Sequence, residues 1–395
     1  MAKRPIEVSS FPYRGEGGKV PEAALTERGC APTILLAFDS FKGCLTAAQA
    51  CQASAEGIKA TWPDAHIVSL PVSDGGEGMV DALASTLALT KVCAIIHNPL
   101  MQPCTAVYAL SADGGTAYIE SAAACGFATF PKSPLLPLRE AGRDFPPLSE
   151  AGRVSYGLGE LILHAISRGA RRLYVGLGGT ATCDGGRGLA ECLRPHLPLP
   201  VEVIGVTDVR NPLYGPQGAA YVFGPQKGAA PEQLPILDQS LREFAAKTVQ
   251  RGLATPALAE QPGAGAAGGL GYALMAYLGA TLRPGIDFML DTLDFNHHLA
   301  AADLVITGEG RSDSQTLMGK APYGILRRCR ALQPQTPVHL LSGAVTDTDA
   351  LLAAGFASVS SINAGDPRPL SSLLIPAVAA QNLSRTAQLL IHNFP

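Results

Sequence analysis

Charge of either sign is scarce in this 395-residue chain. Only 16% of the residues are charged, and 30 Lys and Arg against 33 Asp and Glu leave a formal net charge of -3. Without a basic excess there is no field that would hold a nucleic-acid backbone or an anionic membrane surface. We therefore expect neither of these as a partner, and small molecules are the expected ligands.

Patterns that would indicate bound zinc, disulfides or secretion are also missing. The nine cysteines include no C-x-x-C pair, and the eight histidines show no metal-ligand spacing. Scattered thiols suit a reducing cytosol, and the N-terminus lacks the apolar core of a signal peptide, so a cytoplasmic protein is expected. The one long uncharged stretch, 263–282, has few large apolar residues, which favours a buried glycine-rich loop and helix over a membrane span.

Common catalytic signatures are absent or incomplete. Gly319-Lys320 is followed by Ala321, so it is not a Walker A motif, and no G-x-S-x-G elbow occurs. Residues 176–181 fit the pattern G-x-G-x-x-A after an apolar run. The acidic residue expected about 20 positions later is missing, which leaves an NAD-dependent oxidoreductase as a weaker alternative.

What the sequence does contain is a repeated unit: a short apolar run, a turn rich in Gly and Asp, and then a helix. This order is typical of parallel α/β folds. Strands are predicted at 34–38, 66–72, 172–176 and 304–307, a helix from Thr46 to about Ala60, and a hairpin formed by 105–110 and 117–120. Residues 1–32 are expected to form a loosely ordered extension, and 131–147 a proline-rich loop.

Three lysines stand next to a glycine in turns: Lys42, Lys227 and Lys320. Glycine lets the backbone approach a phosphate closely, and lysine supplies a compensating charge. The combination favours a polyphosphate ligand. For any one turn, a lysine that merely reaches solvent is an equally good interpretation.

Carboxylates gather in the same turns. Seven of them lie at or beside predicted strand ends: Asp39, Asp74, Glu77, Asp184, Asp208, Glu309 and Asp313. Phosphoryl transfer uses such groups to hold Mg²⁺ and to accept the proton of the attacking hydroxyl. Several are expected to be only local backbone caps.

These turns resemble, in order, the motifs of the type-1 glycerate kinases. The matching segments are 39–43, 73–78, 156–162, 178–186, 208–213, 223–228, 263–271, 308–315 and 319–322. The resemblance implies two unlike α/β domains: a Rossmann-like domain from 33–72 and 283–395, and a mixed-sheet domain, 73–282, inserted in it. It also implies a site in the cleft between them, and phosphorylation of D-glycerate by ATP with Mg²⁺, 2-phosphoglycerate being the favoured product.

The resemblance further implies roles for individual residues. Lys42 would contact the glycerate carboxylate or the transferring phosphoryl group, helped by Ser40, and Asp184 and Asp313 would be base and Mg²⁺ ligand in an order left open. The remaining substrate-binding candidates are Asp74, Glu77 and Asp208. The ATP-binding candidates are Gly178, Gly179, Thr180, Lys227, Gly308, Glu309 and Lys320.

The chain departs from the family pattern at several positions. They are Phe38, Leu158, Cys183 and Arg210, together with a segment of a few dozen residues that relatives carry and this chain lacks between Cys192 and Val201. These departures leave a second hypothesis open, a glycerate- or nucleotide-binding paralogue with little turnover that acts as a sensor. The sequence allows a homodimer but does not determine the assembly.

Overall fold

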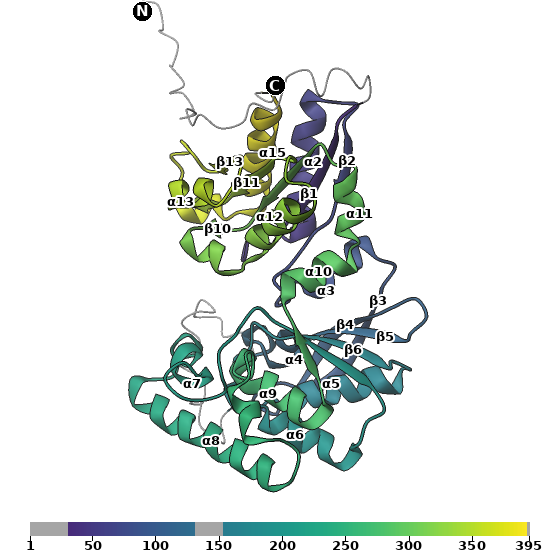
Figure 1. The fold of residues 1–395 in the computed structure, drawn as a ribbon, viewed down its shortest axis with the longest axis vertical. Helices are drawn as coiled ribbons and strands as arrows, with labels where there is room; N and C mark the ends of the chain where they lie inside the picture. Colours follow the sequence, from purple (N-terminus) through teal and green to yellow (C-terminus); the bar gives the residue numbers. More distant parts are fainter. Residues whose placement is uncertain (1–30, 131–152, 393–395) are drawn as a thin grey trace, which may run out of the picture.

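The computed structural model describes residues 31–130 and 153–392, and this part of the chain forms two α/β domains (Figure 1). Each is built on its own sheet, of five and six strands, and β10 (Arg311–Ser312) pairs with β12 (Ala344–Val345) apart from both. The predicted fold class, two unlike α/β domains, is confirmed.

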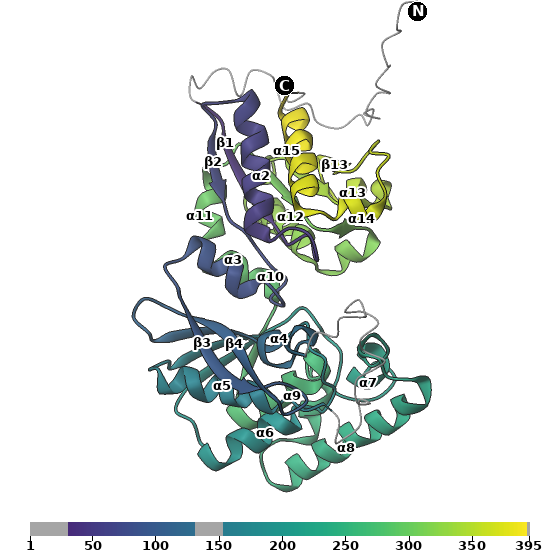
Figure 2. The same cartoon turned by 180° about the vertical axis from the view of Figure 1, so that it is seen from behind.

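The first domain contains a fully parallel sheet with strand order β13-β11-β9-β1-β2. Its strands are β1 (Thr33–Phe38), β2 (His66–Ser69), β9 (Leu304–Gly308), β11 (Val338–Ser342) and β13 (Ser358–Ser361). Alternate residues of β1 pack on opposite faces, because successive side chains of a strand point to opposite sides. Leu36 meets α2 (Ala47–Thr61) and α15 (Pro376–His392), which lie side by side in Figure 2, whereas Leu35 packs toward α12 (Ala321–Leu332).

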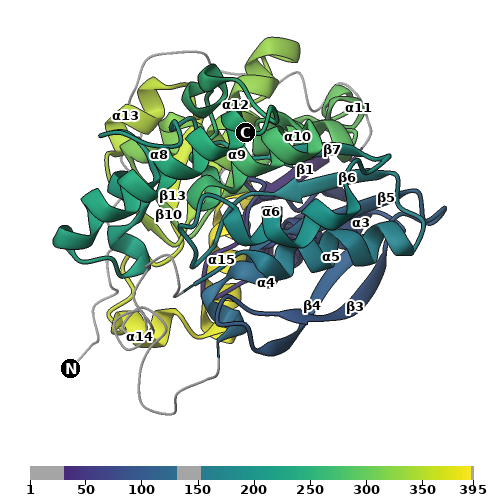
Figure 3. The ribbon, with the colours of Figure 1, turned by 90° about the horizontal axis from the view of Figure 1, so that it is seen from below.

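The second domain contains a mixed sheet with strand order β3-β4-β5-β6-β7-β8. Its strands are β3 (Thr90–His97), β4 (Pro103–Leu110), β5 (Thr116–Glu120), β6 (Arg172–Gly176), β7 (Glu202–Val206) and β8 (Thr281–Arg283). β3, β4 and β5 are antiparallel, and β5 to β8 are parallel. One face is covered by α5 (Tyr156–Ser167), α6 (Arg187–Leu193) and α9 (Ala266–Leu278), visible from below in Figure 3.

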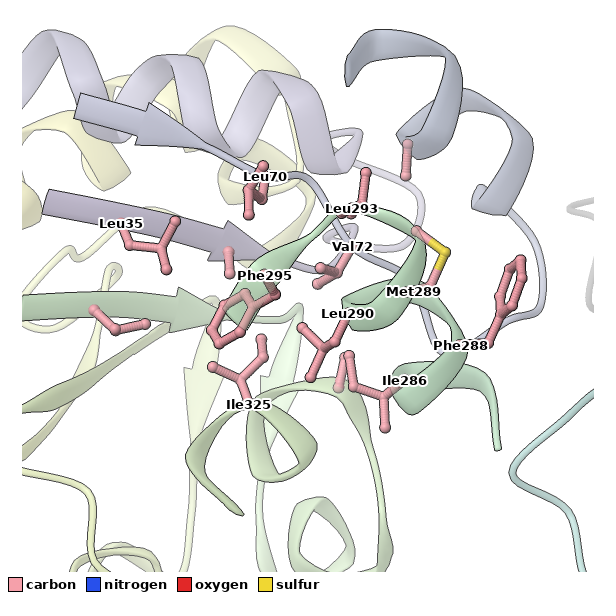
Figure 4. Packing of buried hydrophobic residues seen from close by; sticks show 14 of the residues in the cluster. Leu35, Leu70, Val72, Ile286, Phe288, Met289, Leu290, Leu293, Phe295 and Ile325 are labelled. Carbon is pink, nitrogen blue, oxygen red and sulfur yellow. The ribbon is translucent and has the colours of Figure 1, made fainter. Parts of the chain in front are cut away.

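A helical layer joins the two sheets. It consists of α3 (Met79–Thr86), α10 (Gly285–Thr292) and α11 (Phe295–Ala300). In Figure 1, α3 and α10 lie between the domains and α11 lies alongside the first domain. Met289 and Leu290 of α10 are fully buried and belong to one apolar cluster that includes residues of both sheets, such as Leu35 and Val206. Figure 4 shows the first-domain side of this cluster. The two domains therefore share part of their core.

The remaining described helices are short or peripheral. They are α4 (Ser121–Cys125), α7 (Ala219–Phe223), α8 (Leu234–Gln250), α13 (Thr348–Ala353) and α14 (Leu370–Leu373), with 3-10 turns η1 (Phe127–Thr129), η3 (Arg194–His196), η4 (Pro225–Lys227), η5 (Pro231–Gln233), η6 (Pro256–Glu260) and η7 (Ser314–Met318). Among the helices described, none is both long and apolar enough to cross a bilayer.

Most predicted elements are confirmed. Thr46 caps α2 through a capping box with Gln49, the predicted hairpin is β4 and β5, and α9 is the packed helix expected in 263–282. β2 ends at Ser69, three residues earlier than predicted. Residues 1–30 of the predicted extension and the predicted loop 131–147 lie outside the described residues. The boundaries 33–72, 73–282 and 283–395 stay predictions.

Candidate functional site

Three loops of the first domain meet at one edge of its sheet. Parallel strands end at the same edge, so the segments that follow β1, β2 and β9 emerge together there. The backbone shows this directly, because the Asp39 N–H donates to the carbonyl oxygen of Gly308 at 2.9 Å. Gly308 has no room for a side chain, since an added Cβ would lie 1.7 Å from the carbonyl oxygen of Leu341. Close packing against the Leu341 backbone therefore requires glycine at this position of β9.

The carboxyl group of Asp39 is the most deeply buried acid of this edge. Asp39 is 6% exposed, and its Oδ1 accepts a hydrogen bond from the Ser40 N–H at 2.6 Å. Burial, followed by the negative charge of Asp74, raises its pKa from 3.8 to about 7. A carboxyl with this pKa can take up a proton at neutral pH, as a general base must.

Lys42 lies near this acid and carries the opposite charge. Its Nζ is 3.8 Å from Oδ2 of Asp74, and its pKa is raised by Asp74 first and further by the nearby charges of Asp39, Glu77 and Glu309. The Lys42 side chain is largely exposed. It is therefore held close to four carboxylates while its ammonium remains accessible to a ligand.

Glu309 links this group to Lys320. The buried Glu309 carboxylate accepts hydrogen bonds at Oε1 from the hydroxyls of Thr316 (2.6 Å) and Ser312 (3.1 Å). Its Oε2 is 3.4 Å from Nζ of Lys320. The turn η7 is thus tied to the strand end through Glu309, which places Lys320 at the same edge of the sheet.

The loop 73–78 crosses from the first domain to the second. Gly76 lies against Gly178, which follows β6, and a Cβ on Gly178 would be 3.0 Å from the Gly76 Cα. Next to this contact, the Asp208 Oδ1 accepts a hydrogen bond from the Gly285 N–H at 2.9 Å, at the start of α10. Burial raises the Asp208 pKa to about 7. The carboxyl edges of the two sheets therefore face each other across this loop.

A cavity of about 980 Å³ opens beside loop 73–78 in the second domain. Its lining includes four of the predicted ATP-binding residues, Gly178, Gly179, Thr180 and Lys227. Glu77 lines it as well, and Glu77 also faces Lys42. Most of the predicted residues therefore form two groups, a first-domain cluster around Lys42 and a second-domain cavity, and Glu77 contacts both groups.

Lys227 is buried against the loop that it was predicted to serve. Its Nζ donates to the Thr180 Oγ1 at 2.9 Å and to the carbonyl oxygen of Thr182 at 2.6 Å, and burial lowers its pKa. From the other side, Nη1 of the buried Arg153 donates to the Lys227 carbonyl oxygen at 2.9 Å. Hydrogen bonds from Lys227 and Arg153 thus fix the 180–182 loop to the 224–228 segment at this wall of the cavity.

Asp184 follows the 180–182 loop, and its hydrogen-bond partners lie in the second domain, apart from the Lys42 cluster. Its carboxylate accepts four hydrogen bonds: from the N–H and hydroxyl of Ser155, and from the N–H groups of Gly186 and Gly188, all at 2.8–3.0 Å. These bonds join the starts of α5 and α6. A metal ion or a substrate proton would have to compete with them, because a carboxylate offers about four acceptor positions.

Asp313 belongs to the first domain and caps η7. Its Oδ1 accepts from the Gln315 N–H at 2.9 Å, and its Oδ2 is 3.2 Å from Nε of Arg311. Within the described residues there is no group of three or more His, Cys, Asp or Glu side chains arranged to hold a metal ion. The base and metal-ligand roles assigned to Asp184 and Asp313 stay predictions.

Two side chains at the site do not stand out in the sequence. Asp39 is one of seven carboxylates at strand ends, and Arg153 belongs to none of the matched motifs. Asp39 shares its burial with Glu309 of the same edge, and this burial depends on strands that are distant in sequence. Arg153 belongs to no motif, and its contacts with Lys227, Phe127 and Phe130 are seen only in the structure.

Comparisons with known proteins give one consistent result. A sequence model of the Glycerate kinase family matches residues 34–197 and 191–394. The chain is 37% identical to a glycerate kinase of Bacillus subtilis (90% of this chain, 96% of the relative) and 36% identical to a glycerate 2-kinase of Escherichia coli (80% and 86%). A crystal structure from Salmonella typhimurium LT2 that carries the name glycerate kinase 2 has a TM-score of 0.74 at 36% identity, covering 92% of this chain and 98% of that one.

The alignments also bear on the segment that the sequence suggests is missing. The Bacillus subtilis alignment runs over 385 positions but covers only 90% of this chain, so about 30 positions of the relative have no counterpart here. The family match divides at 191–197, where β7 follows η3 after a short connection. Both observations agree with a shortened loop between Cys192 and Val201.

Proposed function

Since the chain belongs to the glycerate kinase family, we propose that it is an enzyme that phosphorylates D-glycerate with Mg-ATP, giving 2-phosphoglycerate. Family membership supports a kinase that acts on glycerate. The choice of ATP, Mg²⁺ and the 2-hydroxyl is the finer part of the proposal. The observation that carries it is the meeting of a buried carboxyl with raised pKa, an accessible lysine and a large cavity around one crossing loop.

In this proposal Asp39 accepts the proton of the attacking glycerate hydroxyl. Its pKa of about 7 suits a group that must be ionised before the reaction and protonated after it. Lys42 pairs with the carboxylate of glycerate or with the transferring phosphoryl group. Ser40 helps to orient Asp39 through its N–H, and Lys320, held by Glu309, adds positive charge at the same edge.

The cavity of the second domain would bind the nucleotide. Its volume of about 980 Å³ exceeds what a three-carbon acid needs and accommodates a ligand the size of ATP. Gly178, Gly179 and Thr180 would approach the phosphates, and Lys227 would supply fixed positive charge behind them. Because Glu77 lines the cavity and also faces Lys42, the phosphate end would point toward loop 73–78, where the acceptor binds.

A bound Mg²⁺ would neutralise charge on the phosphates during transfer, and it takes one or two protein carboxylates beside phosphate oxygens. Asp313 is the better of the two predicted ligands, because Asp184 already accepts four hydrogen bonds. We assign to Asp184 a positioning role, acting through Ser155 and α6.

The test is a coupled assay for ADP release with purified protein, Mg-ATP and D-glycerate, with the product identified by NMR. Glycerate-dependent ADP release with phosphate on the 2-hydroxyl is the expected result. Absence of a glycerate-dependent signal at high enzyme concentration contradicts the proposal and favours the sensor hypothesis. A product with phosphate on the 3-hydroxyl would contradict only the proposed position of phosphorylation. The cytoplasmic location and the homodimer stay predictions.

A further inference from the structure

The cavity of the second domain is lined by both polar and apolar residues. The polar lining includes Glu77, Glu120, Gln226 and Lys227, together with the 178–180 loop. The apolar lining includes Ala123, Phe127, Phe223 and Pro225, which offer hydrocarbon surface. A triphosphate has no group that would use this hydrocarbon surface, so the apolar lining suits a different chemical group on the same ligand.

Phe127 is the aromatic side chain best placed to receive a planar ring. It is half-buried and lines the cavity. The guanidinium carbon of Arg153 lies over the Phe127 ring, 5.6 Å from its centroid. This contact and the adjacent edge-on ring of Phe130 hold the Phe127 ring in place before any ligand binds. A fixed aromatic face is an effective stacking platform for a base, because little freedom is lost on binding.

The apolar lining is attached directly to the loop 178–180, which is proposed to bind the phosphates. The Ser121 hydroxyl donates to the Gly178 carbonyl oxygen at 3.2 Å, Gly126 forms a β-bridge with Thr180, and the Ala181 N–H donates to the Cys125 carbonyl oxygen at 2.7 Å. Residues 121–130 and the 178–181 loop therefore form one continuous wall. A ligand with its phosphates at Gly178 to Thr180 would extend its other end along this wall toward Phe127.

From this arrangement we propose that the apolar lining of the cavity forms the subsite for the nucleoside base, a purine that stacks on Phe127 between the 122–128 and 223–225 segments. This inference rests on the proposed function for the identity of the phosphate end. It adds the orientation of the nucleotide and the residue that contacts its base.

The test compares two ligands by calorimetry: Mg-ATP, which has a base, and inorganic tripolyphosphate with Mg²⁺, which has none. In Phe127→Ala we expect the Kd of Mg-ATP to rise about tenfold, because an aromatic stacking partner is lost, while the Kd of tripolyphosphate stays within about twofold. Tyr221→Ala is the matched control. Tyr221 is an exposed aromatic residue of α7 outside the cavity lining, and its loss should change neither Kd.

A second variant protects the test against misfolding of the first. Ala123→Leu places bulk in the same subsite without removing the Phe127–Arg153 contact, and it should also weaken Mg-ATP and not tripolyphosphate. Unchanged Mg-ATP affinity in both variants, or equal weakening of both ligands, overturns the proposal. So does a wild-type protein that binds tripolyphosphate as tightly as Mg-ATP, or that binds neither. If the variants weaken Mg-ATP binding but not tripolyphosphate binding, and the wild type shows no glycerate-dependent turnover, only the proposed function is contradicted.

Discussion

At the scale of single residues, Asp39 combines a catalytic proposal with a stability cost. In Asp39→Asn we expect kcat to fall by about 10²- to 10⁴-fold, because the amide cannot accept the hydroxyl proton. For the wild-type enzyme, kcat/KM should rise with pH and level off above an apparent pKa near 7, since only ionised Asp39 accepts the proton. A pH–rate profile of wild type and variant checks both. A variant with full activity and the same profile would contradict the assignment.

The same substitution should stabilise the protein at high pH. The folded-state pKa of Asp39 is raised from 3.8 to about 7, so the folded protein binds the proton more tightly than the unfolded chain between these pH values. Wild-type stability therefore declines from about pH 4 to pH 7 on account of this group. We expect Asp39→Asn to exceed wild type in free energy of unfolding at pH 8, by on the order of 2–4 kcal/mol, and not below pH 4. Urea titrations at the two pH values measure the difference.

For Asp184→Asn we expect the opposite pattern: a loss of stability and only a small loss of kcat. Asn in its place loses one acceptor oxygen, so hydrogen bonds from Ser155 or Gly188 are left without a partner. We expect Asp184→Asn to lower the free energy of unfolding by about 1.5–3 kcal/mol and to reduce kcat far less than Asp39→Asn does. Thermal melts and steady-state kinetics on the same preparation separate the two effects. A loss of kcat as large as that of Asp39→Asn, at unchanged stability, would restore the base or metal-ligand role.

The sequence indicates which loops gather at the candidate site but not which way each side chain points. Asp39 and Glu309 could be placed at strand ends from the apolar runs alone, whereas Lys320 is picked out only by the glycine beside it. Lys227 was predicted to contact a ligand because it adjoins a glycine, yet its ammonium donates to Thr180 and Thr182, which are 47 and 45 residues away in sequence. Whether a lysine in a turn points inward depends on such distant partners, and a local sequence pattern cannot identify them.

At the scale of elements, α10 is central to the core that the two sheets share. Met289 is fully buried in the cluster shared by the two sheets, and Figure 4 shows it among the α10 side chains that face the first domain. Met289→Ala should lower the free energy of unfolding by about 2–5 kcal/mol, because it leaves a cavity in a layer with little freedom to collapse. Chemical denaturation measures this. Met318→Ala, at an 82% exposed residue, is the control and should have little effect.

This helical layer was beyond the reach of sequence reasoning. The apolar runs predicted β1, β6 and β9 within a residue or two, and the capping box predicted where α2 begins. α3 and α10 are short, and an amphipathic period says which side is apolar but not which sheet it will cover. The predicted boundaries at 72/73 and 282/283 therefore do not indicate that residues from both domains form one shared core.

At the scale of the whole molecule, a shared core predicts cooperative unfolding. Trp62, the single tryptophan, lies at the end of α2 in the first domain, so its fluorescence reports that domain, whereas far-UV circular dichroism reports both. We expect the two signals to give coincident urea transitions, because loss of either sheet exposes the cluster on the other. Two separated midpoints, with fluorescence changing first or last, would show that the domains unfold independently.

The inserted arrangement also limits how the protein can be dissected. Val206 and Tyr118 of the second sheet and Leu35 of the first are covered by α3 and α10, whose residues immediately follow the two crossings of the chain. A recombinant fragment of either domain without these helices would present a bare apolar face to water and would be prone to aggregate. Segmental labelling or domain exchange between relatives should therefore carry both helices with whichever half is kept.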